Sequence, residues 1–480
     1  MSNNEITISP TIKKLALKWI ILSLVLLPIL ALLGILMRSV QANLWKGGGL
    51  YFYPMMTLHG VGMAGLWFVA AMVCLQGTLA RYVNISVAVD RFAFWGTVIG
   101  VAVLIASVVG GFGAGWYFLY PLPFHGTWPV WATVLFFVSL TILAVTWLIW
   151  TISIMKAISE KYSFSQALGW HYIFGSGDPK VPPAVLIATV TFICVIACLA
   201  SGAVVVVLFG AEFFAGTAND ALLMKNLTFF FGHLLVNLAM YLGVGAVYDI
   251  LPNYADRPWK TTRAVAIAWN AVLLLVLFAY FHHLYMDFVQ PTALQYIGQV
   301  ASYFSSIPSA LVTIYGGLLL VFHGKFRWNL TSSFMFLGLL GWSIGGMGAV
   351  IDSTILVNSK LHNTLWVPAH FHTYMIMGLV LFTLGAFYHF IQELAQTPES
   401  KVLHRILTSL FVIGGYGFLL MFYMGGANSI PRRYAMYPAE LTKGPVIAQI
   451  AVLFGWILFA GVIVYLFEIG RRFKKACKSD

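Results

Sequence analysis

Charged residues are scarce in this sequence: Asp, Glu, Lys and Arg make up 9% of its 480 residues, whereas 60% are hydrophobic. A water-soluble domain of this length cannot bury so much apolar surface, so the composition excludes a soluble globular protein and indicates a polytopic membrane protein. Cysteine is also rare, and Cys74, Cys194, Cys198 and Cys477 form no credible disulfide framework. Cys194 and Cys198 share a helix face at i and i+4, which favours packing over metal binding.

Long apolar runs fill most of the chain. Twelve of them are long enough to cross a membrane, at about 15–38, 54–79, 91–113, 128–156, 184–210, 225–250, 262–286, 295–322, 330–352, 365–394, 404–424 and 445–469. The first run is too long for the core of a signal peptide, so we expect it to be a membrane span. No internal repeat and no separate soluble domain are apparent. The sequence therefore predicts an all-α integral membrane protein with one domain over residues 1–480, a bundle of about twelve transmembrane helices.

The positive charge follows the expected membrane topology. The net charge of +12 could point to a nucleic-acid partner, but the distribution of the 27 Lys and Arg argues against one. When the N-terminus is placed in the cytoplasm, most of these residues fall in inner loops, as the positive-inside rule requires. We therefore expect both termini and the longest loop, about 157–183, to be cytoplasmic in the inner membrane of a bacterium or archaeon, and we expect no nucleic-acid partner.

Histidines mark the candidate site, beginning with the stretch His362-Asn-Thr-Leu-Trp-Val-Pro-Ala-His-Phe-His372. Each residue of an α-helix turns by about 100°, so His370 and His372 point to nearly opposite sides of one span. Two buried imidazoles aimed in opposite directions need two partners, and metal centres are the usual reason to bury them. The alternating topology brings six histidines of four spans to the outer side of the membrane. These are His59, His233, His282, His283, His370 and His372.

These six histidines divide into a set of three and a second set of three. His233, His282 and His283 suit copper or a similar metal with open coordination positions. The other three account for two haems: His59 with His372 would close a low-spin haem, and His370 would hold a haem that is open on its distal face. The alternative is a cofactor-free transporter in which the histidines relay protons and are satisfied by neighbouring carbonyl groups.

The sequence resembles the catalytic subunit I of the haem–copper oxidase superfamily. The matching motifs are Thr57-Leu-His-Gly60, Gly232-His233, Phe281-His-His283, the stretch 362–372 and Ile430-Pro-Arg-Arg433, in the family's order. The 362–372 stretch is most similar to the B-type oxygen reductases. The resemblance implies the same division of the histidines, with one copper and two haems of undetermined type. It also implies that Arg432 and Arg433 hold haem propionates, which suits paired guanidinium donors. His362 is expected near a propionate as well, although a helix-capping or loop role is an alternative.

Asn237 departs from this pattern. B-type oxygen reductases carry a tyrosine four residues after the first copper histidine, covalently joined to another copper histidine, and that tyrosine supplies the fourth electron and a proton for splitting dioxygen. Residue 237 shares a helix face with His233, and an asparagine can only donate or accept hydrogen bonds. Joining two nitric oxide molecules needs two electrons, so this tyrosine becomes dispensable. The chain thus resembles the B-type-derived nitric oxide reductases, and a neutral side chain at this position favours copper over non-haem iron.

The proton route also departs from the family. B-type oxidases draw protons from the cytoplasm along spans six and eight, where Tyr248 and Ser309 match that route. Val244 and Val312 stand where hydroxyl groups are expected and can neither donate nor accept. Tyr241 and Thr313 lie nearby in the sequence and offer a detour. We expect weak proton pumping or none.

These features together predict a membrane respiratory oxidoreductase of the denitrification type. Nitric oxide reduction to nitrous oxide is favoured over oxygen reduction by a cytochrome c oxidase. The chain contains no cupredoxin-like or cysteine-rich copper segment. The resemblance therefore implies a subunit II with a cupredoxin-like dinuclear copper domain, a periplasmic cytochrome c or cupredoxin as donor, and possible small single-span subunits.

Overall fold

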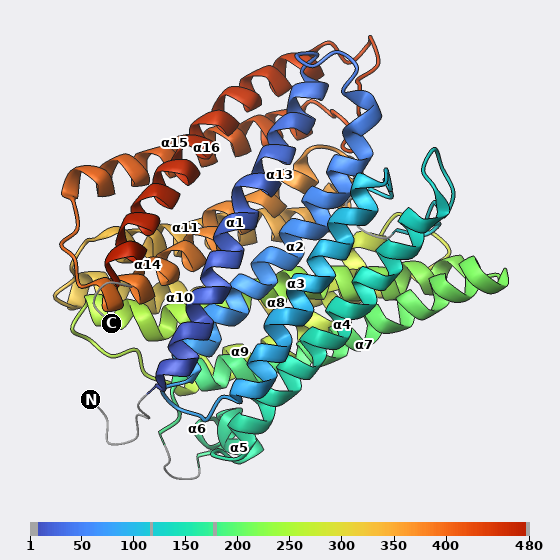
Figure 1. Cartoon of the computed structure of the whole chain (residues 1–480). Coiled ribbons are helices and arrows are strands. Elements are labelled where there is room, and N and C mark those ends of the chain that lie inside the picture. The colour runs from blue at the N-terminus through green and yellow to red at the C-terminus, as the bar shows by residue number, and fades with distance from the viewer. Residues whose placement is uncertain (1–7, 116–118, 176–179, 477–480) are drawn as a thin grey trace.

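The structure, a computed structural model, describes residues 8–115, 119–175 and 180–476 (Figure 1). It confirms the all-helical architecture, with 12 helical segments in these residues that are long and apolar enough to cross a membrane. The long helices are α1 (Pro10–Gln41), α2 (Gly49–Leu79), α3 (Val87–Val109), α4 (Val130–Ser159), α7 (Pro183–Ala215), α8 (Ala221–Ile250), α9 (Arg263–Ala279), α10 (Thr292–His323), α11 (Leu330–Asp352), α14 (Leu381–Ala395), α15 (Lys401–Ala427) and α16 (Lys443–Ala476). Shorter elements are α5 (Phe164–Ala167), α6 (Trp170–Phe174), η1 (Leu251–Tyr254), η2 (Tyr280–Leu284), α12 (Ile355–Leu361), α13 (Trp366–His372) and η3 (Thr373–Val380).

Side-chain caps fix where several of these helices begin. The side chains of Ser86, Asp220 and Thr262 each accept a hydrogen bond from a backbone N–H in the first turn of α3, α8 and α9. These groups have no partner within the helix, so a capping oxygen stabilises the helix start. The caps explain why the spans begin at these residues, although hydropathy alone places the boundaries a few residues away.

Two spans occupy the middle of the bundle. The most apolar window of the span that contains α8 is 83% buried inside the protein, and so is that of the span formed by α13, η3 and α14. The corresponding windows of α3, α10 and α16 are 33%, 28% and 33% buried, so much of their surface faces outward. The two central spans carry His233, His370 and His372, so the candidate site lies in the interior of the bundle.

The central span that carries His370 and His372 is not a uniform α-helix. After α13 the chain continues as a π-helix, η3, and then as α14. π-Helical turns insert an extra residue and are frequent at functional sites. Gly345 of α11 permits close contact here, because a Cβ atom at this position would lie 2.7 Å from the Cα atom and the backbone nitrogen of Tyr374.

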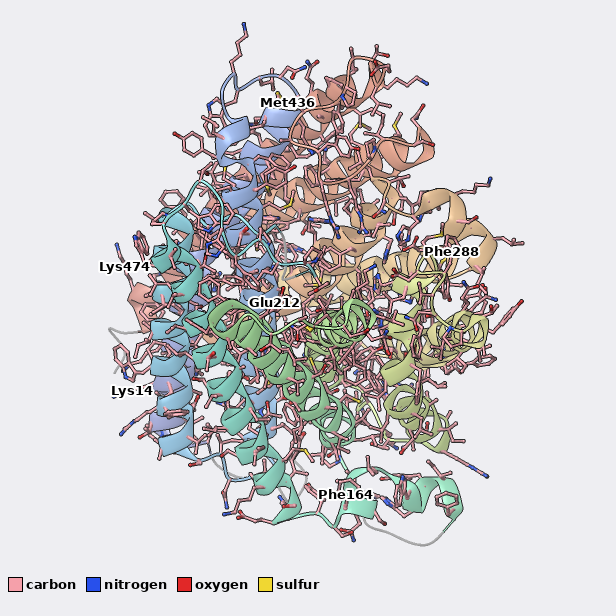
Figure 2. All side chains as sticks on the ribbon, turned by 90° about the vertical axis from the view of Figure 1, so that its right-hand side faces the viewer. Lys14, Phe164, Glu212, Phe288, Met436 and Lys474 are labelled. Carbon is pink, nitrogen blue, oxygen red and sulfur yellow. The ribbon has the colours of Figure 1, made fainter. Side chains whose placement is uncertain are left out.

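The connections gather at the two ends of the bundle. The 157–183 segment is partly helical: it contains α5 and α6, and residues 176–179 within it lie outside the described part. Phe164 of α5 and Met436, which follows α15, lie at opposite ends of the molecule (Figure 2). Cys74, Cys194 and Cys198 are buried free thiols, and Cys477 lies outside the described residues.

Candidate metal and haem centre

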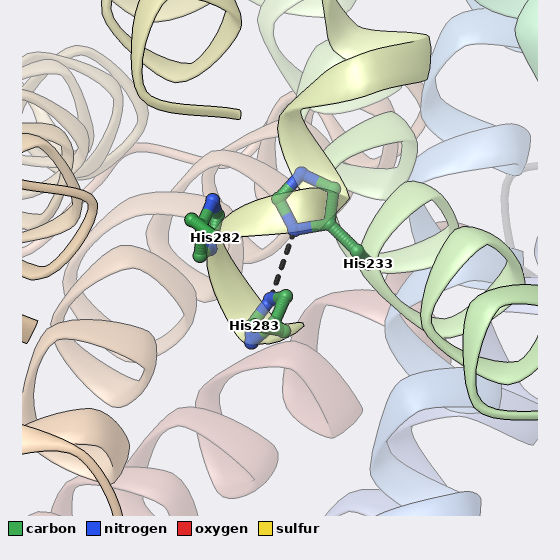
Figure 3. Close-up of side chains that lie close together, drawn as sticks. All are labelled: His233, His282 and His283. Carbon is green, nitrogen blue, oxygen red and sulfur yellow. Dashed lines mark hydrogen bonds between the residues drawn. The ribbon is translucent and has the colours of Figure 1, made fainter. Parts of the chain in front are cut away.

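The first cluster contains the three histidines expected to bind copper. His233 extends from α8, and His282 and His283 lie on η2, the 3-10 turn that continues α9 (Figure 3). One possible ligand atom of each ring lies within 4.8 Å of the other two. Nδ1 of His233 and Nε2 of His283 are 3.1 Å apart. Three imidazole nitrogens that converge in this way form a donor set suited to copper or a similar metal.

Neighbouring polar side chains contact one ring nitrogen of His282 and one ring nitrogen of His233. Nδ1 of His282 lies 2.9 Å from the hydroxyl of Ser302, which itself donates to the Gly298 carbonyl at 2.6 Å. The Ser302 oxygen therefore accepts the Nδ1 proton of His282 and leaves Nε2 available for a metal. On the other side, Nδ2 of Asn237 lies 3.2 Å from Nε2 of His233, which turns Nδ1 of this ring towards His283. The residues present therefore fit a bound copper ion.

The second cluster is the pair His59 and His372. Their rings are nearly parallel, with an interplanar angle of 12° and centroids 6.4 Å apart. Nδ1 of His59 donates to the Leu30 carbonyl at 2.8 Å, and Nδ1 of His372 donates to the Pro368 carbonyl at 2.7 Å. Both Nε2 atoms are therefore free to bind a metal. Two metal–nitrogen bonds of roughly 2 Å, together with the distance from each nitrogen to its ring centre, add up to about this separation.

The packing of α1 against α2 supports the same site. A Cβ atom on Gly34 would lie 2.7 Å from Cε1 of His59, so only a glycine leaves room for the imidazole. His372 stacks on Phe422 with centroids 5.5 Å apart. This arrangement fits the closed low-spin haem that the sequence predicts.

Both clusters open onto one cavity of about 370 Å³. Its lining is largely apolar, which suits the faces of a porphyrin. The polar members of the lining include all six of the predicted histidines together with Arg38, Gln41, Asn237, Ser302, Ser305, Ser306, Tyr374, Arg432 and Arg433. The structure therefore places every predicted ligand around a single interior space.

His370 also lines the cavity, and its polar partner, Asp352, lies outside the 362–372 stretch. Its Nε2 lies 3.3 Å from a carboxylate oxygen of Asp352, at the end of α11, and its Nδ1 is buried with no hydrogen-bond partner among the described residues. A ring that bonds a carboxylate through one nitrogen and has its other nitrogen free is the arrangement of many metal-bound histidines. His370 thus has one ring nitrogen without a partner among these residues, and the Asp352 carboxylate orients the ring through the other.

Of the three residues predicted to lie near propionates, Arg432 and Arg433 line the cavity and His362 does not. Arg432 donates to Oδ1 of Asn363 from both Nε and Nη2, at 3.3 and 3.0 Å. Arg433 has a positive φ of 70°, a sparsely populated conformation for a non-glycine residue. His362 is the C-cap of α12, so the capping alternative describes its backbone. Burial and the charge of Arg432 lower the pKa of His362.

The candidate proton route is a column of hydroxyl groups along α10. The Tyr248 hydroxyl and the Thr313 hydroxyl are 2.8 Å apart, and Thr313 donates to the Ser309 carbonyl at 2.6 Å. Val244 is fully buried and Val312 partly buried. Tyr248 thus contacts Thr313, one of the two residues suggested for a detour, rather than Ser309. Tyr241, the other residue of that detour, packs edge-on against Trp269.

Four residues near the cavity belong to none of the motifs that the sequence predicts as the site. Ser302 and Asp352 contact histidines from other helices, so no local spacing reveals them. Arg38 is buried, bonds Oε1 of Gln41 at 2.6 Å and lies 4.5 Å from the centre of the Phe422 ring. Tyr374 had a detectable signal, because it follows His370 by four residues and i and i+4 share a helix face.

Comparison with known proteins identifies one family over most of the length of this chain. The family model described as cytochrome c and quinol oxidase polypeptide I matches residues 14–465. A protein of Aeropyrum pernix named heme-copper oxidase subunit I+III is 25% identical over 486 residues, which cover 95% of this chain and 57% of that protein. The cytochrome c oxidase subunit 1 of Thermus thermophilus is 25% identical over 449 residues, covering 87% of this chain and 75% of that one.

A solved structure shares the fold. It is described as a heme-copper terminal oxidase dimer, and it matches with a TM-score of 0.76 and 22% sequence identity. The match covers 97% of this chain and 84% of the other. The fold of this chain is therefore one that a solved structure already shows.

Proposed function

Because the chain belongs to the cytochrome c and quinol oxidase polypeptide I family, we propose that it is the catalytic subunit of a membrane respiratory enzyme that reduces nitric oxide to nitrous oxide. We propose two haems, a low-spin one held by His59 and His372 and a high-spin one held by His370, and one copper ion held by His233, His282 and His283. When bound, the high-spin haem iron and the copper supply one electron each to two nitric oxide molecules, which with two protons form nitrous oxide and water.

The observation that carries this proposal is the side chain of Asn237. It lies one helical turn from His233 and contacts that imidazole at 3.2 Å, at the position where the resemblance to the B-type oxygen reductases implies a tyrosine. An amide contributes only hydrogen bonds, so it holds the His233 ring without taking part in electron transfer. A two-electron reaction requires no more from this position.

The remaining residues act on protons and on orientation. Ser302 holds the tautomer of His282, and Asp352 holds the ring of His370. Tyr248 and Thr313 begin a proton route from the inner side, which the two valines interrupt. We propose that both chain termini are cytoplasmic in a bacterial or archaeal inner membrane. We also propose that a subunit II with a dinuclear copper domain receives electrons from a periplasmic cytochrome c or cupredoxin.

Oxygen reduction is the second candidate. The relatives from Aeropyrum pernix and Thermus thermophilus are named as oxidases, and a buried phenol, Tyr374, lies in the cavity wall. These observations favour a terminal oxygen reductase that uses a tyrosine at another position.

The test measures both gases on the purified complex. Nitrous oxide formation is followed by gas chromatography and oxygen uptake with an electrode, using the same reduced donor. We expect rapid nitrous oxide formation. Rapid four-electron oxygen reduction with little nitrous oxide would reject the preference for nitric oxide, and a visible spectrum without haem bands would reject the whole assignment in favour of a transporter.

A further inference from the structure

The hydroxyl column on α10 ends at Gly316. The members of the column are buried, follow one face of the helix and donate to backbone carbonyls of the preceding turn: they are Ser302, Ser305, Ser309 and Thr313. Gly316 is the next residue on that face, one turn beyond Thr313. The column therefore stops at a residue without a side chain, at the end that lies farther from the histidines.

The indole of Trp259 fills the space beside this glycine. A Cβ atom on Gly316 would lie 2.5 Å from Cε2 and 2.7 Å from Nε1 of Trp259, so the indole rests directly on the backbone of α10. The same ring stacks on the phenol of Tyr248, with centroids 3.9 Å apart and an interplanar angle of 24°. Tyr248 is the residue whose hydroxyl lies 2.8 Å from that of Thr313. Trp259 thus packs against both sides of the column's last contact.

The segment that carries Trp259 is anchored before and after the indole. Before it, the Asp256 carboxylate pairs with Arg327 at 2.8 Å, and the backbone N–H of the same arginine donates to the Tyr254 carbonyl at 2.7 Å. After it, the Thr261 hydroxyl donates to a backbone carbonyl just before α7 at 2.7 Å. Trp259 itself is partly exposed, so the indole lies between the column and the outside of the bundle.

An indole at this point interrupts a chain of proton carriers. A hydroxyl group both donates and accepts hydrogen bonds, so Tyr248 and Thr313 can pass a proton between them, whereas the indole N–H only donates. Tyr248 is 2% exposed and Thr313 is fully buried. Neither hydroxyl therefore meets bulk water while the indole is in place.

We propose that Trp259 is a plug that closes this end of the hydroxyl column, so that a proton enters the column only when the indole moves off Tyr248. The inference rests on the proposed function, because it takes the column as a proton route, and it is the same for either gas. Because the backbone is anchored on both sides of the indole, the motion required is a rotation of the Trp259 side chain.

The test measures how well a cysteine placed in the column is shielded from a small thiol reagent. The complex carrying Thr313→Cys is purified and treated with 2-aminoethyl methanethiosulfonate, and modification of the peptide that contains residue 313 is followed by mass spectrometry. We expect the introduced cysteine to be protected. Adding Trp259→Ala should raise its modification rate roughly tenfold or more, because both the stacking and the burial of a large ring are lost.

Trp328→Ala is the matched control in the same Thr313→Cys background. Trp328 is 53% exposed on the connection between α10 and α11, and its ring packs edge-on against Phe326 and Phe336. Its removal should leave the introduced cysteine protected. An equal rise in Trp328→Ala and Trp259→Ala would mean general loosening of this end of the protein and would overturn the plug.

The remaining outcomes separate this inference from the proposed function. Rapid modification with Trp259 present, or an unchanged rate in Trp259→Ala with haem bands intact, would overturn the plug alone. Thiol modification needs no gas turnover, so a complex that forms no nitrous oxide would reject the proposed function and leave this result unaffected. If Trp259→Ala fails to retain the haem bands, Gly316→Ala displaces the indole instead. Faster modification then supports the proposal, and continued protection contradicts it.

Discussion

Replacing Ser302 with alanine is expected to weaken copper binding without touching a metal ligand. Ser302 is 6% exposed, and its oxygen accepts the Nδ1 proton of His282 while its own proton goes to the Gly298 carbonyl. In Ser302→Ala that buried Nδ1–H loses its hydroxyl acceptor and keeps only the Ala279 carbonyl nearby, and a poorly satisfied buried donor costs about 1–3 kcal/mol. Because each 1.4 kcal/mol is about tenfold in affinity, copper affinity should fall roughly 10- to 100-fold.

Competition with a copper chelator of known affinity measures this effect on the detergent-solubilised complex. Copper retained by the protein is determined by mass spectrometry after equilibration, and haem content is read from the visible spectrum. Ser305→Ala is the matched control: it is a buried serine on the same helix, and its hydroxyl donates to the Ser302 carbonyl at 3.3 Å and to no histidine. Equal copper retention by the two variants would refute the reasoning that Ser302 sets the tautomer of His282.

Three further predictions test other parts of the site. Asp352→Asn should lower the frequency of the iron–histidine stretching band of the reduced enzyme in resonance Raman spectra, because His370 loses a charge-assisted hydrogen bond; an unshifted band would contradict that contact. Gly345→Ala should lower the thermal unfolding temperature, corresponding to an overpacking cost of about 1–3 kcal/mol, whereas Gly346→Ala, whose added Cβ meets nothing within 4 Å, should not. Burial lowers the pKa of His362, so the unfolded chain binds this proton first and stability should fall as the pH drops below about 6.5. His362→Asn should lose less stability in that pH range. An identical pH profile for the variant would show that His362 does not cause the loss of stability.

The architecture and the ligand set are the parts of this molecule that local sequence patterns can predict. The number of spans follows from runs of apolar residues, each of which must satisfy its backbone groups within one helix. A two-residue separation sends His370 and His372 to opposite sides of one helix, and the resemblance to the haem–copper oxidases implies that His372 is the one that pairs with His59. The structure brings all of these side chains to one cavity, as alternating topology implies.

Local sequence patterns could not predict the contacts between helices. Ser302 and Asp352 touch their histidines across helix interfaces, and the rotation of each helix about its axis is set by packing that one sequence does not encode in any local spacing. The π-helix has the same apolar composition as an α-helix, so periodicity cannot distinguish them over eight residues. Tyr374 was within reach, since its spacing from His370 repeats that of Asn237 from His233.

The π-helix η3 lies between α13 and α14 in one central span, so its winding sets how these two halves are rotated relative to each other. Its wider winding inserts a residue between the histidines above it and α14 below it. On α14, Nδ1 of His389 lies 2.8 Å from the hydroxyl of Tyr254. Deleting a single residue within 373–380 would restore ordinary winding and swing either the imidazoles out of the cavity or His389 away from Tyr254. This short stretch is therefore a point where the gain or loss of one amino acid would change the orientation of one half of the span relative to the other.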